Sequence, residues 1–244
     1  PVERKQPEYA IKPGDENGAR NGDLVAVEPG PRARLGLPFA TVTDVVGSME
    51  SERAISTIAL HAHSIPHVFP KAVLSEAEAA GPASMAHRED WRSLPLVTID
   101  PADAKDHDDA VHAAPDDDPA NPGGMVVTVA IADVSYYVRP GTKLDSEARL
   151  RGNSVYFPDR VVPMLPERIS NDLCSLRENV DRPALAVRMV LGANGEKRRH
   201  SFHRVMMRSH AKIAYEAAQA AIDGATGDVD PHVTEKMLKP LWAA

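Results

Sequence analysis

The stretch Leu96–Val111, LVTIDPADAKDHDDAV, is an apolar run that leads directly into a cluster of aspartates. Residues 96–99 are apolar or β-branched, as in a buried strand, so Asp100 is expected at the end of that strand. Five aspartates lie within ten residues, with Lys105 as the one opposing charge: Asp100, Asp103, Asp106, Asp108 and Asp109. Carboxylates this close raise each other's pKa unless a cation lies among them. The stretch therefore predicts a site for a divalent cation, with a solvated acidic loop as the alternative.

The composition is that of a globular chain. The 244 residues are 43% hydrophobic and 26% charged, which suffices for one large or two small domains. The single cysteine, Cys174, leaves no internal disulfide, and we expect it to be a small buried hydrophobe rather than a nucleophile. The sequence holds no apolar run long enough to cross a bilayer, so we expect a cytoplasmic protein without a membrane partner.

Basic and acidic residues are unevenly distributed along the chain, whose formal net charge is −7. Residues 139–212 hold 15 Lys and Arg against 8 Asp and Glu, a local charge of +7, and the rest of the chain carries −14. This distribution suits a polyanion that is held by the basic part while its scissile group meets metal ions at the acidic centre. Chance clustering of charges on solvated faces is the alternative.

Alternating apolar and polar residues predict a small β-domain near the N-terminus. Residues 23–28 (DLVAVE) and 39–46 (FATVTDVV) have the pattern of half-buried strands, and residues 55–60 predict a third strand or a short helix. Short strands with Gly and Pro turns are typical of a small barrel such as the oligonucleotide-binding fold, and a small sandwich has the same pattern.

A second, mixed region is expected to follow. Residues 75–78 have the spacing of a capping box for a short helix. Asp133 ends an apolar run as Asp100 does, so it is a weaker site candidate, with a turn or cap role as the alternative. The other predicted elements are a strand at 125–134, a helix at 144–151, an irregular segment at 153–183, a hairpin of 184–191 with 197–207, and a helix at 211–222.

The spacing of the aspartates can be compared with that of known aspartate motifs. Counted from Asp106, the later ligand positions of an EF-hand fall on Ala110 and Val111, so a calcium loop fails. An aspartyl-phosphate phosphatase needs a second aspartate two residues after Asp100, where the chain has Ala102. Neither a Walker loop nor a dinucleotide-binding glycine pattern is present. What remains is a magnesium site with two ions about 4 Å apart, at which four aspartates converge: Asp100, Asp106, Asp108 and Asp109.

The irregular segment places aromatic side chains beside a positive charge. Tyr156 and Phe157 precede Arg160, a combination that stacks bases and follows phosphates in single-stranded nucleic acid. Packing of both aromatic side chains in a core is the alternative.

Three blocks of the sequence together resemble the catalytic (RNB) domain of the RNase II/RNase R family of exoribonucleases, and its RNase R branch more closely. The blocks are TIDPADAKDHDDAV, VAIADVSYYV and GNSVYFPDRVVPMLPERISNDLCSL, in the order of the family. GDENGARNGDLVAVE and HAHSIPHVFP are similar to the second cold-shock-type barrel of these enzymes and its exit. The resemblance implies an α+β chain: a partial cold-shock/OB-type barrel at 1–70, a linker with a short helix at 71–95, and the N-terminal part of a mixed α/β RNB domain at 96–244.

The resemblance implies a hydrolytic, processive exoribonuclease that degrades RNA from the 3′ end to nucleoside 5′-monophosphates, using magnesium or, in its place, manganese. Asp108 matches the active-site aspartate most critical for cleavage, and Asp103 is outside the set. The four matching aspartates are Asp100, Asp106, Asp108 and Asp109.

The resemblance also implies residues that contact the single-stranded 3′ end of RNA. Tyr156 matches the tyrosine that stacks on the 3′-terminal nucleotide, and Tyr215 matches one near the terminal ribose. Arg160 is expected beside the RNA for the reason given above, and the 2′-hydroxyl would give selectivity for RNA.

The sequence also departs from the family. The segment PDDDPANPGG at 115–124 is expected to be a local insertion in a solvent-exposed loop. Because the chain begins at Pro1 and its match stops within the catalytic domain at Ala244, we expect an internal fragment that lacks the arginine engaging the scissile phosphate. A catalytically inactive RNA-binding fragment, of undefined oligomeric state, is therefore the alternative function. An acidic calcium-binding module is a third hypothesis.

Overall fold

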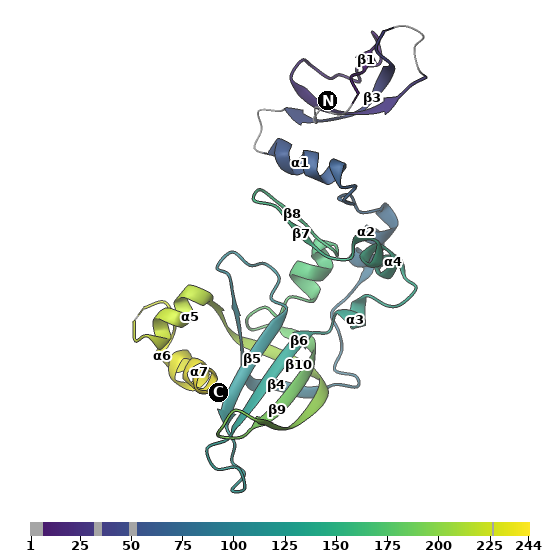
Figure 1. Ribbon diagram of the computed structural model, residues 1–244. Coiled ribbons are helices and arrows are strands. Elements are labelled where there is room, and N and C mark those ends of the chain that lie inside the picture. Colours follow the sequence, from purple (N-terminus) through teal and green to yellow (C-terminus); the bar gives the residue numbers. More distant parts are fainter. Residues whose placement is uncertain (1–6, 32–35, 49–52, 226) are drawn as a thin grey trace. The chain divides into compact units, whose positions relative to one another are not determined.

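The computed structural model describes residues 7–31, 36–48, 53–225 and 227–244 (Figure 1). The chain divides into two compact units. Unit 1 comprises residues 1–69 and 150–164, and unit 2 comprises residues 70–149 and 165–244.

Unit 1 is built on a three-stranded sheet in the order β1-β3-β2. Its strands are β1 (Ala10–Ile11), β2 (Asp23–Pro29) and β3 (Phe39–Ser48), with β1 parallel and β2 antiparallel to β3. Ala40 and Val42 are both buried on one face of β3, as the period of two along a strand predicts. Within the described residues this sheet is open, which agrees with the expected partial barrel.

The stretch that predicted a strand or a helix is helical: α1 (Arg53–Ala62) follows β3 and buries Leu60. Unit 1 also holds a short antiparallel pair from later in the chain, β7 (Val155–Tyr156) and β8 (Val161–Val162).

Unit 2 contains five strands that close into a barrel in the order β10-β4-β5-β6-β9 (Figure 1). Strand β10 is parallel to β4, and the other neighbouring pairs are antiparallel. The strands are β4 (Glu89–Asp100), β5 (Asp109–Pro115), β6 (Met125–Ala132), β9 (Asp181–Leu191) and β10 (Lys197–Ala214).

Small side chains line the interior of this barrel, because five strands enclose little space. Ala110, Ala130 and Ala186 lie opposite one another on β5, β6 and β9, and each is at most 1% exposed. The adjacent row on these strands is exposed and consists of Asp109, Ile131 and Leu185. Alternation along β5 therefore places the Asp109 carboxylate on the outer surface of the barrel.

Helices cover part of this outer surface. The helix α5 (Tyr215–Ile222) is followed by α6 (Pro231–Val233), a π-helical turn (Thr234–Leu238) and α7 (Lys239–Ala243). Their buried side chains pack on Val97 and Ile213. Because β4 is covered on both faces, consecutive residues 96–98 are all fully buried, which explains the continuous apolar run in the sequence. No helix in the described ranges is long and apolar enough to span a membrane.

The helix predicted from the capping box begins earlier than expected. It is α2 (Lys71–Ala79), so Ser75 lies inside it and the predicted N-terminus was wrong. Glu76 of this helix has a different role: its carboxylate accepts hydrogen bonds from the backbone N–H groups of Lys143 and Leu144. These groups open α4 (Lys143–Arg151), so Glu76 caps a helix distant in sequence. The other helical elements are α3 (Val134–Tyr137) and a π-helical segment (Arg168–Leu173).

Strand β10 is longer than the hairpin pattern predicted. It continues to Ala214, so α5 begins at Tyr215 rather than at Ala211. Residues 211–214 pair with residues 97–100 of β4. This tertiary pairing overrides the helix propensity of the alanine-rich sequence.

Candidate active site

The parallel pairing of β4 with β10 brings two predicted site residues to one end of the barrel. Ala214 lies opposite Asp100 in the register, and Tyr215 follows it as the first residue of α5. Asp100 is 9% exposed, whereas Tyr215 is 54% exposed.

The other three predicted aspartates lie where the chain returns from β4 to β5. Residues 101–108 form a loop, and Asp109 is the first residue of β5. The N–H group of Ala132 on β6 donates to the carbonyl oxygen of Asp108 at 2.9 Å, which holds the exit of the loop. Asp106 is half-buried, and the side chains of Asp108 and Asp109 are exposed.

These carboxylates are close enough to perturb one another. Partial desolvation, and then the charges of Asp106, Asp109 and Asp100 in decreasing order, raise the pKa of Asp108 above its usual value. Partial desolvation and the charge of Asp100 raise the pKa of Asp109 in the same way. Asp103 is exposed, and its charge contributes to neither of these raised pKa values. The four predicted aspartates therefore interact as a group, without Asp103.

The donor set of this group suits a hard cation. Carboxylates are the oxygen ligands that magnesium and manganese prefer, and a cation would relieve the repulsion that raises two of the pKa values. In the part of the chain that the structure describes, no three His, Cys, Asp or Glu side chains form a preformed metal site. The residues thus fit such an ion in chemistry and charge.

Two residues that the sequence analysis missed hold the aspartate loop. The Nδ1 atom of His107 lies 2.7 Å from Oδ2 of Asp100, and His107 is 4% exposed. Ser175, which is fully buried, contacts the loop through its hydroxyl group. Nothing in the spacing marks His107 as buried, and Ser175 is 68 positions away from it, so neither contact could be read from the sequence.

Tyr156 and Arg160 lie in unit 1. Tyr156 on β7 is 68% exposed, so the alternative that it packs in a core was wrong. Arg160 forms an ion pair with Asp159 at 3.0 Å, and Asp159 also accepts a hydrogen bond from Ser56. Both residues thus belong to unit 1, whereas the predicted aspartates belong to unit 2.

Asp133 and Cys174, which the sequence analysis also considered, are both buried. Asp133, the weaker site candidate, is buried in an ion pair with Arg88. Cys174 is 3% exposed, and burial raises the pKa of its thiol to about 12, so it is a buried hydrophobe as expected.

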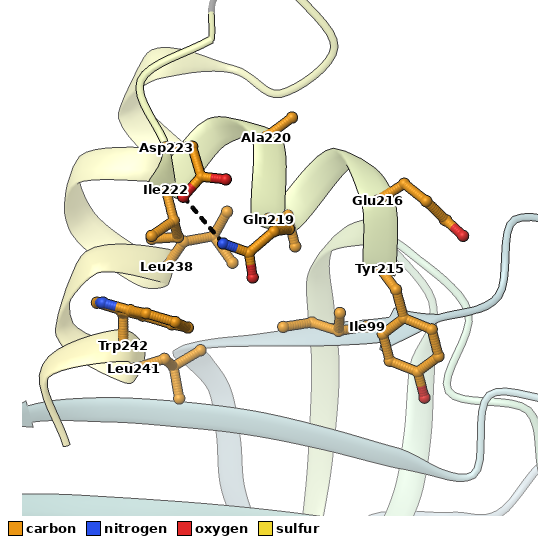
Figure 2. Close-up of a pocket in the computed structure, with 11 residues that line it drawn as sticks. Ile99, Tyr215, Glu216, Gln219, Ala220, Ile222, Asp223, Leu238, Leu241 and Trp242 are labelled. Carbon is orange, nitrogen blue, oxygen red and sulfur yellow. Dashed lines mark hydrogen bonds between the residues drawn. The ribbon is translucent and has the colours of Figure 1, made fainter.

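A pocket of about 790 Å³ lies beside the end of β4 and is lined mainly by apolar side chains (Figure 2). Figure 2 shows Ile99 between the ring of Tyr215 on α5 and that of Trp242 on α7. Because Ile99 directly precedes Asp100, this pocket adjoins the start of the aspartate loop.

Similarity to known proteins covers most of the chain. The sequence matches the model of the RNB domain over residues 88–242 and that of the cold shock domain over residues 3–70. It is 42% identical over 221 residues to Ribonuclease R of Escherichia coli (strain K12), a match that covers 88% of this chain and 26% of that relative. The chain thus spans about a quarter of the length of this curated relative.

Solved structures of similar fold come from Mycoplasma genitalium. Its RNase R in complex with double-stranded RNA has a TM-score of 0.86 at 24% identity, over 96% of this chain and 42% of that one. The same protein in complex with ribose methylated single-stranded RNA has a TM-score of 0.84 at 25% identity, over 96% of this chain and 36% of that one. These likenesses confirm the expected α+β architecture.

Proposed function

Because this chain belongs to the RNB-domain family, we propose that it forms the aspartate-bearing part of a hydrolytic, processive 3′→5′ exoribonuclease that releases nucleoside 5′-monophosphates. The observation that carries the proposal is the placement of four carboxylates at the end of β4, in the loop that follows and at the start of β5, where partial desolvation and their mutual charges raise the pKa of Asp108 and Asp109. A concentration of negative charge at one end of a barrel is the environment in which a divalent cation binds. The four proposed ligands are Asp100, Asp106, Asp108 and Asp109.

The proposed ion is magnesium, or manganese in its place. A bound pair of such ions would activate a water molecule and stabilise the leaving 3′-oxygen of a phosphodiester. The chain itself supplies orientation: Asp100 ends β4, Asp109 begins β5, and the loop between them presents Asp108. Partial desolvation around Asp108 strengthens its attraction to a cation.

The proposed contacts for the single-stranded 3′ end of RNA are Tyr156, Tyr215 and Arg160. Both tyrosines are more than half exposed, at 68% and 54%, so each ring presents surface on which a base or ribose can pack. The guanidinium group of Arg160 supplies positive charge for a phosphate, and a 2′-hydroxyl contact would distinguish RNA from DNA. The M. genitalium structure that contains single-stranded RNA supports RNA as the ligand class.

A second candidate function is RNA binding without cleavage. One observation favours it: among the described residues, the acidic side chains do not form a preformed three-ligand site. The match to about a quarter of the Escherichia coli relative is consistent with a site that needs groups from elsewhere in a longer protein.

Degradation of a 5′-labelled single-stranded RNA by the purified chain, with magnesium or with EDTA, separates the two candidates. The first expects processive degradation from the 3′ end, with release of nucleoside 5′-monophosphates, only when magnesium is present. Binding without shortening favours the second candidate for the isolated chain.

A chimera then tests the aspartates within a complete protein. In it, this chain replaces the segment of the Escherichia coli relative that it matches. The proposal expects magnesium-dependent degradation by the chimera and its loss in the Asp108→Asn variant. Equal rates in both proteins would overturn the assignment of the aspartates.

A further inference from the structure

We propose that His107 is a positioning residue, which orients the carboxylate of Asp100 and is itself held in place by Ser175. This inference deepens the proposed function and rests on it. The inference concerns the buried side of the aspartate site. The pattern of charges in the sequence does not indicate which residue contacts Asp100 there.

His107 and Asp100 form a buried side-chain contact. The imidazole Nδ1 and the carboxylate Oδ2 are 2.7 Å apart, and their side chains are only 5% and 13% exposed. Because an ionised carboxylate can only accept, Nδ1 carries the hydrogen of this bond. This bond engages one of the two carboxylate oxygens, and His107 thereby restricts the rotation of the carboxylate.

The backbone of His107 is bound on both sides to the segment at residues 175–176. Its N–H group donates to the hydroxyl oxygen of Ser175 at 3.1 Å, and its carbonyl oxygen accepts from the N–H group of Leu176 at 2.8 Å. The hydroxyl group of Ser175 in turn donates to the carbonyl oxygen of Lys105 at 3.2 Å. One fully buried serine therefore fixes the backbone on either side of Asp106.

Ser175 is itself anchored by Arg182. The guanidinium group of Arg182, on β9, donates to the carbonyl oxygen of Ser175 at 3.0 Å and to that of Asp172 at 2.9 Å. Arg182 is 7% exposed, and its strand belongs to the barrel. The aspartate loop is thus connected to the barrel through Ser175 and Arg182 as well as through β4 and β5.

These contacts give His107 a role beyond filling space in the core. An apolar side chain could occupy the position of His107, yet it would leave the inner oxygen of Asp100 without a donor. Groups that hold metal ligands by hydrogen bonds typically change metal affinity about 10–100-fold when they are removed. A residue that only fills the core would alter stability and leave the affinity unchanged.

The first test is the affinity of the purified chain for manganese, measured by calorimetry. His107→Phe keeps a ring but removes the donor, and we expect about tenfold weaker binding. His107→Asn retains an N–H group close to the position of Nδ1, and we expect binding within about threefold of the unmodified chain. Asp103→Asn is the control for a change outside the group, with unchanged affinity.

The outcomes separate this inference from the proposed function. If the unmodified chain binds no manganese, or binds it no better than Asp108→Asn, the cation site itself is refuted and the inference with it. If Asp108→Asn binds more weakly but His107→Phe binds as the unmodified chain does, only the role of His107 is refuted. Equal weakening in the Phe and Asn variants would also refute it, because the donor would then be irrelevant.

The second test needs no metal and follows amide hydrogen exchange at residues 105–108. Ser175→Ala removes the hydroxyl that binds this segment, and we expect exchange roughly five- to tenfold faster there. Ser170→Ala is a matched control, because the hydroxyl of Ser170 bonds to Asn171 instead. Unchanged exchange in Ser175→Ala, or equal acceleration in both variants, would overturn the positioning of the loop by Ser175.

Discussion

The guanidinium group of Arg88 donates a hydrogen bond of 2.7 Å to the carboxylate of Asp133, and both side chains are only 2% exposed. Burial opposes ionisation of this aspartate, but hydrogen bonds from Ser135 and Arg88 outweigh it and lower the pKa of Asp133. The pair therefore remains charged inside unit 2, where neither partner tolerates the loss of the other.

Arg88→Met is expected to destabilise the protein strongly, because it removes the closer of the two arginines that face the buried Asp133 carboxylate and leaves only Arg204, at 3.6 Å, to oppose its charge. Breaking a buried ion pair typically costs about 3–5 kcal/mol of the free energy of unfolding. Denaturation by urea at neutral pH measures this change. In the control Arg149→Met, an exposed ion pair with Asp145 is lost, and less than about 1 kcal/mol is expected. A similar small effect of both substitutions would contradict the prediction.

Asp108→Asn in the chimera is expected to lower the rate of RNA degradation by on the order of 10²–10³, the usual effect of removing one charge-stabilising group from an active site. Asp103→Asn makes the same charge change five residues away and should leave the rate within about twofold. The rates are measured with saturating RNA, and RNA affinity is measured separately. Comparable losses in the two variants would show that net charge, rather than the position of Asp108, matters.

The same substitution should stabilise the metal-free chain at neutral pH. The pKa of Asp108 is raised in the folded state, so its ionised carboxylate destabilises the fold as the pH rises through that folded-state pKa. Below the usual aspartate pKa of 3.8 the group is protonated in both states, and the difference vanishes. In thermal melts without divalent cations, Asp108→Asn should raise Tm by roughly 1–2 °C at pH 7 and leave it unchanged at pH 3. A lower Tm of the variant at pH 7 would refute this.

Tyr156→Ala is expected to weaken binding of single-stranded RNA by about 1–3 kcal/mol, the usual contribution of stacking a base on an aromatic ring. Because the ring is 68% exposed, its removal should leave the melting temperature unchanged. Tyr156→Phe keeps the ring and should bind as the unmodified chain does. Fluorescence anisotropy with a labelled oligonucleotide gives all three affinities, and equal weakening by Phe and Ala would assign the effect to the hydroxyl group instead.

Cys174 should not react with thiol reagents while the protein is folded. Its pKa is raised to about 12 from the usual 9, which lowers the thiolate fraction at pH 8 by on the order of 10³. Labelling with a chromogenic disulfide should therefore be slow without denaturant and rapid in urea. Rapid labelling of the native protein would show that the segment around Cys174, and with it Ser175, opens readily.

Sequence patterns predicted those features of the structure that are determined by residues close together in the chain. The apolar residues before Asp100 predicted a buried strand end, and the crowding of aspartates predicted the mutual repulsion that, after partial desolvation, raises the pKa of Asp108 and Asp109. The alternation in residues 39–46 predicted β3 for the same kind of reason. In each case, neighbours in the sequence are also the neighbours that determine the environment.

The features that the sequence did not predict depend on distant partners. Residues 211–214 continue β10 because β4 lies beside them, although their composition favours a helix. Ser175 touches the aspartate loop across 68 positions, and Arg88 neutralises Asp133 across 45. Residue types and spacing carry no trace of such pairings, so Asp133 resembled a second site residue until its partner was known.

The aspartate loop depends on Ser175 and on β10, which the ribosome adds to the chain later than the loop itself. A ribosome completes the loop long before it reaches Ala214, and at about 5–20 residues per second the delay is roughly 5–20 s. Until then β10 cannot complete the barrel beside β4. Under the proposed function, a nascent chain that has not yet reached Ala214 therefore lacks the closed barrel that carries its nuclease centre, while it is attached to its own messenger RNA.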